Sequence, residues 1–80
     1  MSWDFRVRGF AGVNHHAGVP LGQLLVETTH KGIASAQIEV QTWQRRIERG
    51  DASRCELIDL RPGGKLTHLN IKATSVINWQ

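Results

Sequence analysis

The sequence lacks the features that hold small chains together covalently or attach them to a membrane. Its 80 residues include one cysteine, Cys55, which excludes an internal disulfide framework and makes a reducing compartment the simplest location. No stretch approaches the roughly 18 uninterrupted apolar residues of a membrane span. The segment MSWDFRVRGF mixes charged and aromatic side chains without a continuous apolar core, unlike a secretory signal. We therefore expect a cytoplasmic chain with no membrane partner.

Known catalytic and cofactor-binding motifs are also absent. No serine lies in a G-x-S-x-G context, and the glycines form neither G-x-G-x-x-G nor a P-loop. Cys55 opens a predicted strand, where a free cysteine usually serves as a small buried apolar side chain. Glu56 and Asp59 could form a carboxylate pair, but such spacing is common on strands. Because so short a chain has little packing to spare for a cavity, we predict a protein that is not an enzyme and binds no cofactor.

A pair of adjacent histidines, His15 and His16, lies in the segment GFAGVNHHAGVP. The density of glycine there predicts a long loop over residues 9–22, and long loops in small domains are either functional or mobile. Neighbouring residues of an extended loop point apart, and no further histidine or cysteine lies at a spacing typical of a metal site. The pattern favours a mobile connection without bound metal. A metal- or pH-responsive loop is the alternative.

Two strands are predicted before residue 30. WDFRVR, residues 3–8, alternates aromatic or β-branched side chains with charged ones, which is typical of a half-buried strand. Gly9 interrupts this alternation and indicates a bulge or a strand end. QLLVETT, residues 23–29, is the second predicted strand, with apolar residues on both faces that indicate partial cover from both sides.

Residues 33–49 fit a helix better than a strand, although residues 36–42 also alternate as a strand would. The last turn is rich in arginine, which suits the negative end of the helix dipole, and Gly50 stands where a C-terminal cap belongs. Thr28 or Thr29 could cap the other end. Apolar side chains follow the three- and four-residue spacing of a helix face at Ile33, Ala36, Val40, Trp43 and Ile47. Ile38 falls opposite this stripe, so we expect it to be exposed or covered by a partner.

The remainder of the chain is predicted to be β. CELIDL (55–60) and KLTHLNIK (65–72) flank RPGG, whose Pro-Gly pair suits the centre of a type II turn and predicts a hairpin. SVINW (75–79) is a short last strand. The predicted order is β-β-α-β-β-β, a single α+β domain over residues 1–80 with one amphipathic helix packed on a small antiparallel sheet.

The three tryptophans, Trp3, Trp43 and Trp79, lie near the two ends of the chain and in the helix stripe. Tryptophan buries a large area and also anchors interfaces. In so short a chain we expect one core cluster that joins both terminal strands to the helix.

The net charge of +3 arises in the second half of the chain. Residues 1–40 hold three basic and three acidic side chains, whereas residues 41–80 hold seven basic and four acidic ones. Guanidinium groups bind phosphate in a bidentate manner, so a nucleic-acid-binding domain is the alternative function, acting through phosphates without base readout. The residues that would carry it are Arg45, Arg46, Arg49 and Arg54.

The first hypothesis is a small non-enzymatic interaction module that binds another protein or forms a homodimer. It depends on the marginal core of so short a chain, on the off-face Ile38, and on open sheet edges that accept a further strand. Interspersed acidic residues weaken the nucleic-acid alternative, because they repel phosphate.

Overall fold

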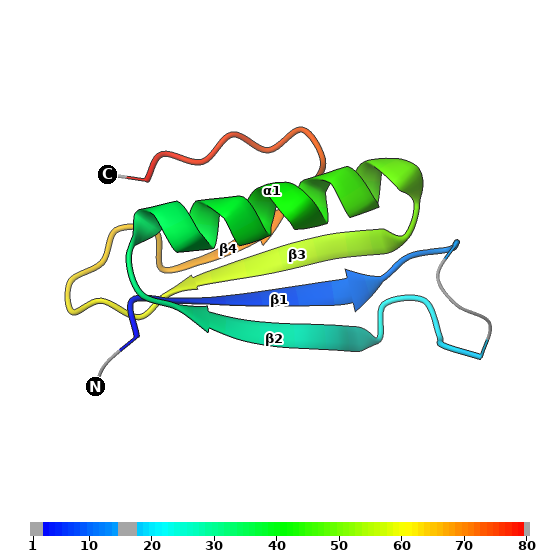
Figure 1. Ribbon diagram of the computed structural model, residues 1–80, viewed down its shortest axis with the longest axis horizontal. Helices are drawn as coiled ribbons and strands as arrows, with labels where there is room; N and C mark the ends of the chain where they lie inside the picture. The colour runs from blue at the N-terminus through cyan, green and yellow to red at the C-terminus, as the bar shows by residue number, and fades with distance from the viewer. Residues whose placement is uncertain (1–2, 15–17, 80) are drawn as a thin grey trace.

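A computed structural model describes residues 3–14 and 18–79, and it contains one helix packed on a four-stranded antiparallel sheet (Figure 1). The sheet order is β2-β1-β3-β4, with the helix between β2 and β3 in sequence. The predicted α+β class and the helix at 33–49 are confirmed. The elements are β1 (Phe5–Ala11), β2 (Leu24–His30), α1 (Ile33–Arg49), β3 (Ala52–Asp59) and β4 (His68–Ile71).

β1 is the strand that the alternating WDFRVR pattern predicted. Phe5 and Val7 are fully buried under the helix, and the arginines between and after them lie on the other face. The strand continues through Gly9 to Ala11, with a break in its register to β2 after Gly9. The irregularity at Gly9 is therefore a bulge in the pairing and not a strand end, so the connection to β2 begins only after Ala11.

The helix begins and ends as its sequence predicts, but its N-terminus is capped differently. Gly50 adopts the left-handed conformation and its N–H donates to the carbonyls of the last turn. Thr28 and Thr29, the predicted N-caps, lie inside β2. No side chain caps the first turn, and the Asp4 carboxylate, from the start of the sheet, accepts a hydrogen bond of 3.0 Å from the Gly32 N–H. A residue distant in sequence thus supplies the carboxylate at this helix end.

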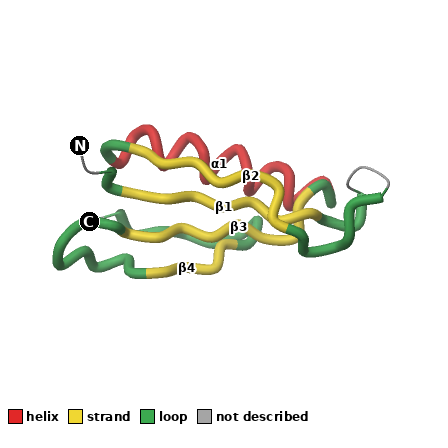
Figure 2. The backbone as a smooth tube through the Cα atoms, turned by 90° about the horizontal axis from the view of Figure 1, so that it is seen from below, coloured by secondary structure: helices red, strands yellow, loops and turns green. Residues whose placement is uncertain are grey.

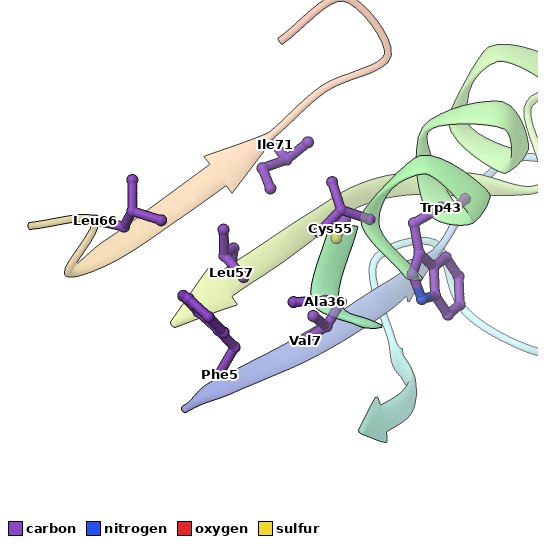
Figure 3. Close-up of a cluster of buried hydrophobic side chains, with 10 residues drawn as sticks. Phe5, Val7, Ala36, Trp43, Cys55, Leu57, Leu66 and Ile71 are labelled. Atoms are coloured by element: carbon purple, nitrogen blue, oxygen red, sulfur yellow. The ribbon is translucent and has the colours of Figure 1, made fainter. Parts of the chain in front are cut away.

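The core lies between α1 and the inner face of the sheet (Figure 3). α1 packs chiefly on β3 and β1 and less on β2. Its predicted stripe is confirmed: the middle of the stripe is buried, and its two ends pack against the core from the side. The buried cluster consists of Phe5, Val7, Ala36, Val40, Trp43, Ala52, Cys55, Leu57, Leu66 and Ile71.

The predicted last strand over residues 75–79 is wrong. This segment is extended but pairs with no strand of the described sheet, and it runs along α1 (Figure 1). The Gln44 side-chain amide donates to the carbonyls of Lys72 (3.1 Å) and Ser75 (2.9 Å), which binds the tail to the helix. Trp79 then packs edge-on against Phe5, with ring centroids 5.7 Å apart. Trp79 and Trp43 join the core, whereas Trp3 is 47% exposed, so the predicted three-tryptophan cluster is only partly formed.

The β3–β4 hairpin is confirmed, and Asp59 organises its connection. The Gly64 N–H donates to the Arg61 carbonyl and Gly63 has φ 68°, as the type II turn requires. The buried Asp59 carboxylate accepts bonds from the Arg61 N–H, Nε and Nη2 and from the Leu66 N–H. The hydrogen bonds from Arg61 hold the pKa of Asp59 well below its ordinary value, at about 2.

Asp59 therefore makes the folded state sensitive to acid. Because its pKa is lower in the folded state than the ordinary 3.8, its contribution is fully present above pH 4 and is lost as the pH falls from about 4 to 2. We expect this contribution to be about 1–2 kcal/mol, since the Arg61 partner is partly solvated. Urea unfolding of wild type and Asp59→Asn should differ by this amount at pH 7 and converge near pH 2. A difference that does not change with pH would contradict the assignment.

Among the described residues, no helix has both the length and the apolar character that crossing a membrane requires.

Candidate functional site

The free edge of β2 is the longer of the two edges of the sheet. β2 pairs on one side with β1, and no strand in the described part of the chain pairs with its other side. It is seven residues long, whereas β4 at the opposite edge has four. Exposed backbone N–H and C=O groups at such an edge can accept a further strand. Figure 2 shows β2 at the border of the sheet.

Apolar side chains surround this edge. Leu21 and Leu24 are exposed and Val26 is 43% exposed, although all are large aliphatic residues. Val26 lies on the helix side of the sheet, opposite Gly9, and is exposed because α1 lies mainly over β1 and β3. Leu24 pairs with Phe10 and lies on the other face, and Leu21 precedes the strand. We define the β2 edge surface as β2 together with Leu21. Its exposed aliphatic groups are the kind that a bound partner would remove from water.

A bulge in β2 turns Leu25 towards the core. Gly9 pairs with Val26 and Phe10 pairs with Leu24, so Leu25 is the extra residue on this strand. Leu25 packs against the core cluster and lines a hollow of about 340 Å³ together with Trp43, Arg46 and Asp51. The bulge leaves the stretch from Val26 to His30 as the regular part of the free edge.

Few charges protect the edge against strand addition. β2 contains neither lysine nor proline, the residues that most often block pairing. Its one carboxylate, Glu27, accepts a hydrogen bond of 2.7 Å from Arg8 Nε and lies 3.3 Å from Arg6 Nε. His30 forms hydrogen bonds with Thr28 Oγ1 (2.7 Å) and Ser35 Oγ (2.8 Å). The polar side chains of β2 are thus bound within the chain, and its charge is balanced by β1.

The structure separates the arginines that the sequence grouped together. Arg46 lies over the Trp43 ring at 4.6 Å, and Arg49 forms an ion pair of 3.5 Å with Asp51. Arg45 is exposed on α1. Arg54, in contrast, is on the sheet face opposite the helix, where its guanidinium covers the Phe10 ring at 3.8 Å. The predicted basic cluster is therefore not a single surface.

Ile38 is 65% exposed on α1. This agrees with its predicted position off the helix stripe. The β2 edge surface was missed as a specific site, although open edges were expected. The sequence feature that could have indicated this surface is the aliphatic run LLV in residues 24–26, in a strand without lysine.

The remaining sequence candidates do not form a site together. Cys55 is fully buried, and burial raises the pKa of its thiol to about 12, so it packs as the predicted small apolar side chain. Glu56 pairs with Arg8 and Asp59 with Phe5 in the sheet, which places the two carboxylates on opposite faces. His15 and His16 lie outside the described residues. Within residues 3–14 and 18–79, no cluster of three or more metal-ligating side chains is present.

The chain was compared with known proteins in three ways. A scan against protein-family models, a search of curated proteins and a search of solved structures each returned no match.

Proposed function

We propose that this chain is a non-enzymatic interaction module that pairs with a second copy of itself through the free edge of β2. The observation that carries the proposal is a seven-residue edge strand, bordered by exposed aliphatic side chains, that the helix leaves largely uncovered. Pairing would extend the sheet across both copies and remove these side chains from water. A second copy is the simplest occupant, because an edge that pairs with itself around a two-fold axis is self-complementary.

The sequence of β2 favours one register for this pairing. In an antiparallel pair, two residues directly opposite each other have their side chains on the same face of the sheet, so their sequence numbers in two copies of β2 differ by an even number. A two-fold axis that relates the two copies therefore passes beside one residue, which lies opposite its own copy. An axis at Glu27 sets two carboxylates opposite each other, which is unfavourable. An axis at Thr28 sets Thr28 opposite its own copy and Val26 opposite the partner subunit's His30, without opposing charges. The aliphatic residues then flank the new strand pair.

The test compares two exposed aliphatic residues on different surfaces. Val26→Lys places a charge on the β2 edge, whereas Ile38→Lys places the same charge on the outer side of α1. We expect wild type and Ile38→Lys to have the mass of a dimer by light scattering. The Val26→Lys dimer should dissociate at protein concentrations at least tenfold higher than the wild-type dimer does, because a desolvated, unpaired lysine is costly at an interface.

Circular dichroism will verify that each variant is folded. A monomeric wild type at all accessible concentrations would contradict the proposal. Dissociation by Ile38→Lys but not by Val26→Lys would also contradict it, and would identify α1 as the contact surface.

A further inference from the structure

The sheet face opposite α1 carries arginines from β1 and β3. Alternation along the strands places on this face the residues that do not point towards the helix. No element in the described ranges covers them. We call this surface the outer sheet face, and it consists of Arg6, Arg8, Phe10, Leu24, Glu27, Thr29, Arg54, Glu56, Ile58, His68 and Asn70.

Glu56, one of the two acidic residues of the outer sheet face, lies beneath its basic groups. Glu56 is only 9% exposed, and its carboxylate lies 2.7 Å from His68 Nε2 and 3.3 Å from Arg54 Nη1. Arg8 contacts both this carboxylate, at 3.9 Å, and that of Glu27, at 2.7 Å, whose side chain is 38% exposed. Although burial opposes ionisation, the hydrogen bonds from His68 and Arg54 lower the pKa of Glu56. The buried Glu56 carboxylate therefore positions His68 and Arg54.

The arginines are held in defined positions but remain accessible. Arg54 stacks on Phe10 at 3.8 Å and donates a hydrogen bond of 3.0 Å to Asn70 Oδ1. Arg6 and Arg8 are both held by Glu27, and about a third of each side chain is exposed. A stacked guanidinium presents its second flat side and its unused N–H groups outwards. Less side-chain entropy is then lost when a ligand binds.

We infer that the outer sheet face binds single-stranded nucleic acid, with phosphates held by Arg6, Arg8 and Arg54 and bases stacked on the guanidinium planes. Arginine planes and open sheets both serve this recognition. A protein partner fits this face less well, because protein interfaces centre on exposed aromatic or aliphatic anchors. Here Phe10 is buried beneath Arg54 and Ile58 is half-buried, and the exposed Leu24 lies at the border of the face, on β2. The surface belongs to one copy of the chain, so it does not depend on pairing through β2.

The test measures the anisotropy of a labelled oligothymidylate of about 12 nucleotides at increasing salt. The double variant Arg6→Gln/Arg54→Gln removes two cations. It keeps the ion pair of Arg8 with Glu27 and the contacts of Arg8 and His68 with Glu56. The matched control, Arg45→Gln/Arg49→Gln, removes the same charge from the helix end. We expect the outer-face variant to bind at least tenfold more weakly. Its plot of log affinity against log salt concentration should be less steep than that of wild type by about 1.4, or about 0.7 for each lost phosphate contact. The control should stay within about twofold of wild type, since non-local charges are screened.

A gain of binding provides a second test that does not depend on a loss. Thr29→Lys adds a cation to the outer sheet face, keeps the ion pairs of Arg6 and Arg8 with Glu27, and should tighten binding by roughly threefold. The inference is overturned if wild type does not bind at about 50 mM salt, or if the helix-end control loses as much affinity as the outer-face variant. It is also overturned if Thr29→Lys weakens binding, or if polyglutamate displaces the oligonucleotide at equal charge concentration.

Discussion

Trp43→Ala will lower the free energy of unfolding by about 3–5 kcal/mol, the range for emptying a buried aromatic site. Trp43 is 2% exposed and is the largest fully buried side chain in the described core. It spans the layer between α1 and β1, where Gly9 leaves room for the ring. Its Nε1 donates a bond of 3.0 Å to Glu39, so the substitution also leaves that carboxylate without this donor. In a domain of this size the loss approaches the whole stability.

Urea unfolding followed by circular dichroism will measure this loss. Trp3→Ala is the matched control, because Trp3 is half-exposed and should cost less than about 1 kcal/mol. Should Trp43→Ala unfold at nearly the same urea concentration as wild type, the central role of this side chain in the core would be wrong.

Gly9→Ala will lower the free energy of unfolding by about 3 kcal/mol, at the upper end of the range for overpacking a core. A Cβ at residue 9 would overlap the six-membered ring of Trp43. The ring is rigid and enclosed, so relief requires that α1 or β1 move. Gly9 does not have a positive φ, so alanine meets no backbone penalty and the whole effect is steric.

The Trp43→Leu background isolates this steric cause. Leucine leaves space above residue 9, so Gly9→Ala should cost less than about 1 kcal/mol there, and the two substitutions should couple by about 2 kcal/mol. Thermal or urea unfolding of the four proteins completes the cycle. Equal costs in both backgrounds would mean that contact with Trp43 is not why residue 9 is glycine.

Local patterns determined the secondary structure with few errors. The helix runs from Ile33 to Arg49 as predicted, because its apolar spacing and Gly50 are properties of consecutive residues. The Pro-Gly turn and the alternation in β1 were equally local signals. The prediction of a strand over 75–79 failed because an extended, partly apolar segment can satisfy its backbone in more than one way. Here the Gln44 amide donates to the carbonyl of Ser75, at the start of the segment, and to that of Lys72 before it.

The candidate sites were predictable only in part. Exposure of Ile38 followed from the helix periodicity, and open sheet edges followed from the small number of strands. The sequence did not indicate which strand lies at the edge of the sheet, because β1 pairs with both β2 and β3 only through residues distant in sequence. The same pairing decided which arginines share a surface. Arg54 is near the helix-end arginines in the chain but joins Arg6 and Arg8 in space.

The sequence by itself therefore determined the α+β class, the bounds of the helix, the hairpin and the buried stripe of the helix. These follow from periodicity, capping and turn chemistry, whose causes act over a few neighbouring residues. Only the tertiary structure decided the strand order, the exposed β2 edge, the outer sheet face, and the hydrogen bond from the Gly32 N–H to the Asp4 carboxylate. Each of these depends on contacts between segments far apart in the chain, which the folding of the whole core selects and no local pattern records.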